Sequence, residues 1–170
     1  TQLTVSITTG PTSAGTLNAT VTTNSAAGSA TQVATVAPVV TGSTASLAAN
    51  ASTITIAGLG FDSTIANDSV TFDNGAAGTV TAASSTSITV NLTTRPVTAG
   101  SFSAVVTSNG VSSGVPVQVA NVTPVVTSAT TQVAANASTV TINGFGFDPA
   151  VANNAVTFNN SAVGAITSAT

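Results

Sequence analysis

Polar and apolar residues alternate with a period of two along much of the chain. An alternation of this period predicts a β-strand with one face toward a core and the other toward solvent. Here the outward positions carry mainly Thr and Ser. No stretch shows the 3.6-residue spacing of an amphipathic helix. Five clear examples of the alternation are residues 53–56, 69–72, 87–92, 101–104 and 115–119.

The pattern repeats along the chain with an offset of 86 residues. VAPVVT at 36–41 returns as VTPVVT at 122–127, and TITIAGLGFD at 53–62 returns as TVTINGFGFD at 139–148. Near the other end, the segment that begins at Leu3 matches the segment that begins at Ile88, with an offset of 85. A fixed offset of this kind indicates tandem copies of one structural unit.

The repeat predicts three parts of the chain. Residues 38–123 form one complete unit of 86 residues, residues 1–37 correspond to the C-terminal half of a unit, and residues 124–170 to the N-terminal half of the next. Two organisations fit this division. The chain is either a window of a longer tandem array, or a permuted subunit in which neighbouring copies complete one another.

Turn-forming residues separate the predicted strands. They include Gly58 and Gly60, the Asp73-Asn74-Gly75 run and the Asn109-Gly110 pair. About seven short strands with turns every 8 to 12 residues are typical of an antiparallel immunoglobulin-like sandwich. We therefore predict an all-β fold made of tandem immunoglobulin-like sandwiches, each about 85 residues long.

The order of the short motifs resembles a known family. A Pro-Val-Val-Thr strand precedes a Thr-Ile-Thr-Ile strand that ends in Gly-x-Gly-Phe, and Val-Thr-Phe, Ser-Ile-Thr-Val and Gly-x-Phe-x-Ala-Val-Val strands follow. This series resembles the IPT/TIG immunoglobulin-like domain and covers essentially the whole chain as two units. The resemblance implies tandem arrays in large bacterial surface proteins, which serve as stalk, matrix or adhesin material.

Composition narrows the possible functions. Charged residues make up 3% of the chain, with one Arg and four Asp, and His, Cys, Met, Trp and Tyr are absent. Most side chains used for proton transfer, covalent attack or cofactor attachment are therefore missing, and we predict neither an enzyme nor a cofactor. Arg95 is the only cation, which argues against nucleic-acid binding, including that of the DNA-binding members of the family. No apolar run is long enough to span a membrane.

Four carboxylates are candidate calcium ligands. Asp62, Asp68 and Asp73 lie within twelve residues, and Asp148 occupies the position of Asp62 in the next unit. Calcium prefers several oxygen ligands. The second unit replaces Asp68 and Asp73 by Asn, which lowers the charge of such a site. The alternative interpretation is that these Asp and Asn side chains close turns through hydrogen bonds to their own backbone.

The glycines and phenylalanines favour structural interpretations. The Gly-x-Gly pattern at Gly58 and Gly60 lacks the third glycine and the helix of a nucleotide-binding loop, so we predict a bend or bulge at the strand end. Phe145, which matches Leu59, is expected at a junction between units. The other five aromatic residues are predicted to lie in the core: Phe61, Phe72, Phe102, Phe147 and Phe158.

Seven Asn-x-Ser/Thr sequons are candidate glycosylation sites. Thr and Ser together make up 55 of the 170 residues, so chance alone supplies several sequons, and the β-propensity of Thr also explains its abundance. Exposed hydroxyls are further candidates for O-linked sugars. The seven sequons begin at Asn18, Asn50, Asn67, Asn91, Asn121, Asn136 and Asn159.

The uncharged strands favour assembly over a free monomer. Soluble monomers usually protect their sheet edges with charge, and this chain has almost none. We expect a structural repeat protein that forms an extracellular or cell-surface filament, sheath or stalk, with neighbouring repeats or subunits as its partners. The alternative is an adhesin or glycan-binding array, which would require a binding loop rich in aromatic or charged side chains.

Overall fold

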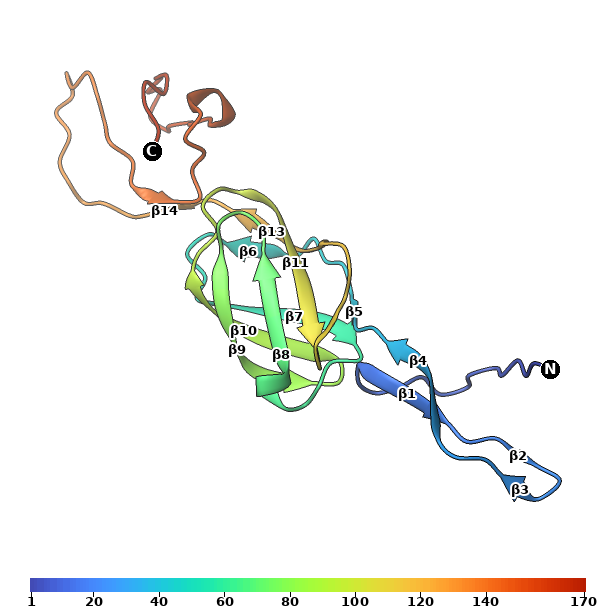
Figure 1. Cartoon of the computed structure of the whole chain (residues 1–170). Coiled ribbons are helices and arrows are strands. Elements are labelled where there is room, and N and C mark those ends of the chain that lie inside the picture. Colours follow the sequence, from blue (N-terminus) through green and yellow to red (C-terminus); the bar gives the residue numbers. More distant parts are fainter.

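The structure, a computed structural model, describes residues 1–170 and is elongated (Figure 1). A β-sandwich formed by residues 38–123, the central domain, occupies the middle. Residues 1–37, the N-terminal arm, leave one end of it, and residues 124–170, the C-terminal segment, leave the opposite end. Strands make up nearly all of the regular structure, together with two short 3-10 turns.

The central domain is a sandwich of two sheets. One sheet has the strand order β5-β7-β10-β9, and the other has the order β12-β11-β13-β6, with β8 also paired to β11. All neighbours are antiparallel except β13 and β6, which run parallel. The prediction of an all-β immunoglobulin-like sandwich is confirmed. The elements are β5 (Val39–Val40), β6 (Ser46–Ala48), β7 (Thr53–Leu59), η1 (Ile65–Asn67), β8 (Asp68–Phe72), β9 (Ala77–Ser84), β10 (Ser87–Thr94), β11 (Gly100–Ser108), β12 (Val111–Ser112) and β13 (Val117–Thr123).

The core lies between the two sheets and follows the predicted alternation. In β7, buried and exposed residues alternate along the whole strand, and Ile54 and Ile56 point inward. Ile88 and Val90 of β10 are fully buried opposite them. Phe102 of β11 is also fully buried and stacks on a second aromatic ring. Burial of these apolar side chains is the main term that stabilises such a domain.

Two predictions about individual positions were wrong. The strand predicted over residues 115–119 begins only at Val117, because the exposed Pro116 has no amide hydrogen to donate to a neighbouring strand. Phe158 was expected in the core but is 40% exposed, since the C-terminal segment forms no strand that covers it. Phe72 and Phe147 are partly buried, whereas Phe61 is fully buried as expected.

The N-terminal arm carries a two-stranded ribbon: β1 (Gly15–Ala19) pairs with β4 (Thr31–Val36), and the short strands β2 (Thr22–Thr23) and β3 (Ala26–Ala27) close its far end. Its register equals that of β11 and β13, residue for residue, after the sequence offsets are applied. Even the irregularity after Leu17 returns after Phe102. Residues 1–14 form no strand.

The C-terminal segment is the least regular part. It contains β14 (Val125–Val126), β15 (Gly144–Phe145) and the turn η2 (Val151–Asn153). The β14–β15 pairing repeats the register of β5 and β7. Residues 139–142, which repeat the start of β7, form no strand, because no neighbouring strand lies beside them. Nor does the structure contain a helix long and apolar enough to cross a membrane.

Candidate functional site

The carboxylate of Asp62 lies at the end of the sandwich, just after β7. It accepts hydrogen bonds from the amide of Thr64 at 2.7 Å and from the side-chain amide of Asn109 at 2.9 Å. The backbone amide of Asp62 donates to the hydroxyl of Ser108 at 3.1 Å and to a carboxylate oxygen of Asp68 at 3.4 Å. The cluster thus ties the loop after β7 to the turn that follows β11.

These hydrogen bonds favour the charged form of Asp62. Donation by the Thr64 amide, then by Asn109 and Asn67, lowers the pKa of Asp62 from 3.8 to about 2. Hydrogen bonds to a carboxylate stabilise its ionised form, whereas burial acts in the opposite direction and is the smaller effect here.

Asp68 is buried beside this cluster and one of its oxygens has no hydrogen-bond partner. The Oδ1 atom accepts from the amide of Asp62, but the Oδ2 atom is buried and unpaired. A buried polar atom without a partner lowers the stability of a fold. Asp68 is therefore the one side chain of the cluster with a buried polar atom that makes no hydrogen bond.

The C-terminal segment contains a second version of this cluster around Asp148. The carboxylate accepts from the amide of Ala150 at 2.8 Å and from the side-chain amide of Asn153 at 2.9 Å. These bonds lower the pKa of Asp148, with Asn153 as the largest cause. Asn154, which replaces Asp68, uses both ends of its amide: Oδ1 accepts from the Asp148 amide, and Nδ2 donates to the carbonyl oxygens of Asp148 and Ala150.

The structure brings together two of the four candidate calcium ligands. Asp62 and Asp68 are neighbours, but Asp73 lies elsewhere and accepts from the amide of Ser103 at 2.9 Å. Asp148 lies in the C-terminal segment. No group of three carboxylates forms. The contacts described above are those of turn closure, and the calcium site stays a prediction.

The Gly-x-Gly pattern serves close packing. A side chain at Gly58 would overlap the ring of Phe61 and the carbonyl oxygen of Val39, and Gly144 stands in the same relation to Phe147 and Val125. The predicted bend is present at Gly60, whose φ is +77°. The sequence interpretation missed the ring contact, although its signal is visible in both repeats as an aromatic residue three positions after the first glycine.

All seven predicted glycosylation sites are exposed in the structure, which leaves each asparagine accessible from solvent. Their modification stays a prediction. The exposed residues are Asn18, Asn50, Asn67, Asn91, Asn121, Asn136 and Asn159.

The two ends of the central domain carry the same backbone joint. At one end the amide of Ala14 donates to the carbonyl oxygen of Gly60 at 2.7 Å. At the other end the amide of Ala99 donates to the carbonyl oxygen of Gly146 at 2.9 Å. Ala99 follows Ala14 by 85 residues and Gly146 follows Gly60 by 86. At the first joint Asn109 also donates to the carbonyl oxygen of Ala14 at 3.0 Å. One geometry therefore connects the arm to the domain and the domain to the C-terminal segment.

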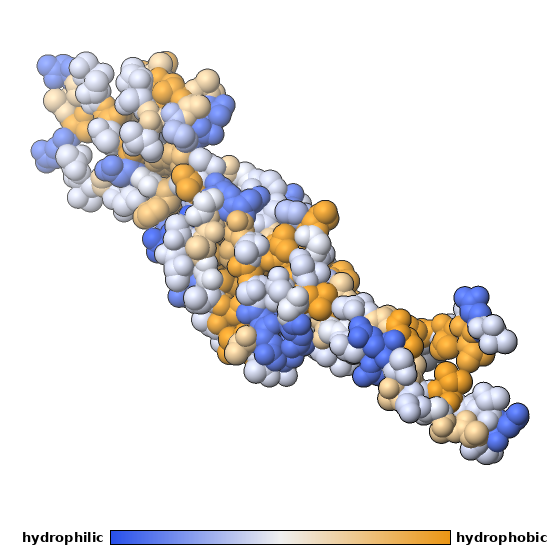
Figure 2. All heavy atoms as spheres, in the orientation of Figure 1, coloured by the Kyte–Doolittle hydropathy of each residue, from blue (hydrophilic) through white to orange (hydrophobic).

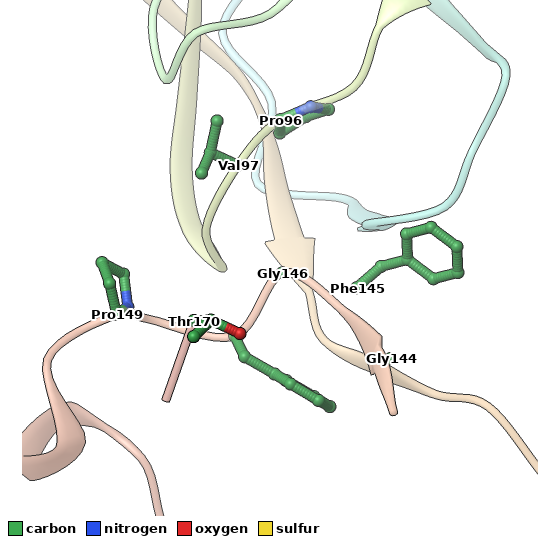
Figure 3. A pocket seen from close by; sticks show the side chains of 8 residues that line it. Pro96, Val97, Gly144, Phe145, Gly146, Pro149 and Thr170 are labelled. Atoms are coloured by element: carbon green, nitrogen blue, oxygen red, sulfur yellow. The ribbon is translucent and has the colours of Figure 1, made fainter. Parts of the chain in front are cut away.

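A shallow cavity of about 270 Å³ lies at the second joint (Figure 3). Pro96 and Val97 of the central domain lie on one side of it, and Gly146 and Pro149 on the other. The guanidinium of Arg95 lies 5.6 Å from the centre of the Phe145 ring, an arrangement favourable for a cation–π contact. The prediction that Phe145 lies at a junction is confirmed. The cavity is thus lined by residues of both parts that meet at this joint.

Apolar side chains are exposed on both terminal parts. Figure 2 shows hydrophobic residues along the N-terminal arm and in the C-terminal segment. On the arm, Leu3, Val5 and Ile7 are all more than half exposed. Residues 1–13 are all exposed, so nothing in the structure covers these apolar side chains.

Comparison with known proteins identifies the central sandwich. Residues 38–120 match the family model of the IPT/TIG domain. No curated protein and no solved structure matches the chain significantly. The match spans β5 to most of β13, which are the strands of both sheets. IPT/TIG domains are non-enzymatic immunoglobulin-like domains that are common in surface and extracellular proteins. Residues 38–120 therefore belong to the IPT/TIG family.

Proposed function

We propose that this chain is a non-enzymatic structural protein of extracellular filaments, sheaths or stalks, built from tandem immunoglobulin-like repeats. The repeated joint is the observation that carries the proposal. Ala14 with Gly60 and Ala99 with Gly146 make the same backbone hydrogen bond at opposite ends of the domain.

A joint that repeats between successive units applies one rotation and one translation at every step. A head-to-tail contact of this kind generates an open filament unless the rotation closes a ring. The joint places the arm and the C-terminal segment at opposite ends of the central domain (Figure 1), which is the arrangement that open growth requires.

The chemistry of the surface supports the same proposal. The chain carries few charges that would keep copies apart, and no loop gathers aromatic and charged side chains as a glycan-binding site would. Arg95 and Phe145 are one charged and one aromatic side chain that lie close together, but they contact each other at the joint. We place the protein outside the cell or at the cell surface, where IPT/TIG domains are common.

Electron microscopy of the purified 170-residue chain over a concentration series tests the proposal. We expect unbranched filaments with a constant axial repeat. Saturable binding of the chain to a glycan array, without any ordered assembly, would instead establish the adhesin function and overturn the structural one.

A further inference from the structure

The exposed apolar residues of the arm repeat a buried strand of the central domain. With the offset of 85, Leu3, Val5 and Ile7 correspond to Ile88, Val90 and Leu92 of β10, all of which are buried. Val5 is 78% exposed, whereas its counterpart in the domain is completely buried. The arm therefore exposes to solvent the apolar residues whose counterparts form the inward face of β10.

Within residues 124–170, no segment corresponds to β10, the strand that the arm repeats. Val140, more than half exposed, corresponds to the buried Ile54 of β7, and Ile54 pairs with Val90 of β10. Transferred through the offsets, this pairing places Val5 opposite Val140. On the same basis Leu3 lies opposite Ile142. An arm and a C-terminal segment thus contain the two halves of one antiparallel pair.

The second sheet gives the same result. In the domain, Ala104 of β11 pairs with Phe72 of β8, which places Ala19 opposite the exposed Phe158. Val122 of β13 pairs with Leu47 of β6 in the parallel direction, which places Val36 opposite Val133. In both sheets, therefore, residues of the arm correspond to the partners of exposed residues in the C-terminal segment.

Each terminal part already has one of the strand pairings of the complete sandwich. The β1–β4 ribbon has the register of β11 and β13, and β14–β15 has the register of β5 and β7. Segments that hold their bound conformation in advance lose less conformational entropy when they bind. The joint fixes the two parts at opposite ends of the same molecule, so they cannot meet within one chain.

We propose that residues 1–37 of one copy pack on residues 124–170 of a second copy and complete an immunoglobulin-like sandwich between two chains. This inference rests on the proposed filament function and specifies the contact by which the filament grows. Each copy donates an arm at one end and receives one at the other, so growth is head to tail and open.

A polar contact accompanies the apolar one. Asn24 corresponds to Asn109, and both adopt a positive φ, 51° and 50° respectively. In the domain, Asn109 donates to the carboxylate of Asp62. In the completed sandwich, Asn24 of the incoming arm donates in the same way to Asp148 of the receiving copy. The arm is thus fixed by a hydrogen bond at the end nearest the joint.

A cysteine pair tests the proposed register directly, because the chain has no cysteine of its own. In the domain the hydroxyls of Thr55 and Thr89 are 3.3 Å apart on the solvent face. Their counterparts are Thr141 and Thr4. After oxidation with oxidised glutathione, the Thr4→Cys/Thr141→Cys chain is expected to run as a ladder of linked multimers on a denaturing gel without reductant.

Two further variants serve as the positive and the negative control for this experiment. Thr55→Cys/Thr89→Cys is expected to form an intrachain disulfide and so shows that the geometry permits the bond. Thr4→Cys/Thr139→Cys displaces one partner by two residues on the same face, to about 7–8 Å, and is expected to give little ladder. Equal ladders from the register pair and the displaced pair would overturn the inference.

A charged residue introduced into the proposed apolar contact between copies tests whether this contact is needed for assembly. Val5→Asp is expected to abolish filament formation, whereas Val115→Asp, at a central-domain position that is also 78% exposed, is expected to leave it unchanged. Val5→Asp chains mixed with Val140→Asp chains are expected to form dimers, since each retains one intact surface. Thermal unfolding of the central domain is expected to be the same in all of these variants.

The outcomes separate the inference from the proposed function. Filaments that persist in Val5→Asp would overturn arm exchange and leave the filament function standing. A parent chain that forms no ordered assembly at any concentration would overturn both.

Discussion

At the scale of single residues, Asp68 can be compared with the residue at the same position of the next repeat. The same position holds Asn154 in the C-terminal segment, where the amide satisfies two carbonyl oxygens, at 2.7 and 3.0 Å. Asp68 places a second oxygen at the equivalent point and leaves it buried and unpaired. The loops at residues 62–68 and 148–154 also differ at their second to fourth positions, but only the Asn154 side chain has both ends hydrogen-bonded.

We predict that Asp68→Asn stabilises the central domain by about 1 kcal/mol, because the new amide can donate to the carbonyl oxygens of Asp62 and Thr64. Urea unfolding at neutral pH measures the change. Asp73→Asn serves as the control, since the Oδ1 of Asp73 already accepts from Ser103, and it is expected to give no gain. A destabilised Asp68→Asn variant would contradict the assignment.

The lowered pKa of Asp62 predicts a dependence of stability on pH. A carboxylate whose pKa falls on folding stabilises the folded state above its unfolded pKa, near 3.8, and this contribution is lost as the pH falls toward about 2. The free energy of unfolding of the parent chain is therefore expected to decrease over this window. Asp62→Asn should flatten the decrease, and chemical unfolding at a series of pH values measures both slopes. An unchanged slope would show that another group is responsible.

At the scale of elements, β7 was predictable because its alternation is strict and both of its neighbours lie within the same domain. Residues 139–142 have the same alternation but form no strand, since a pattern specifies which face is apolar and does not supply a neighbour. The Asn109-Gly110 pair predicted a turn correctly. Its hydrogen bond to Asp62 spans 47 residues, and no local signal indicates a contact over that distance.

Gly58 gives a test at this scale. Gly58→Ala is expected to destabilise the central domain by about 1–3 kcal/mol, because the added methyl group would overlap the Phe61 ring and the carbonyl oxygen of Val39 in β5. Gly42→Ala is the matched control, since its methyl group would meet only ordinary contacts at 3.6 and 3.7 Å. Thermal unfolding compares the two, and equal midpoints would show that β5 and the ring can move aside.

At the scale of the whole molecule, the proposed assembly would depend on apolar contacts and backbone hydrogen bonds, because Arg95 is the only cationic side chain available for ion pairs. Salt screens charges but leaves apolar contacts largely intact. We therefore predict that the minimum concentration for filament formation changes by less than about twofold between about 0.05 and 1 M NaCl. Cooling should raise it, because apolar association weakens at low temperature.

Sedimentation of filaments over a concentration series measures both effects. Ammonium sulfate, which strengthens apolar burial, is expected to lower the threshold and serves as the positive control. A threshold that rises steeply with NaCl would show that the few carboxylates contribute to the contact between copies.

The irregularity after Leu17, which recurs after Phe102, would limit errors of register in the proposed filament. A uniform ribbon can slide along its partner in steps of two residues and keep the same face inward. The extra residue lies within the β1–β4 pair and makes the ribbon non-uniform, so a shift by two residues would no longer give an equivalent contact with a second copy. We therefore expect each added copy to bind in the same register as the copy before it.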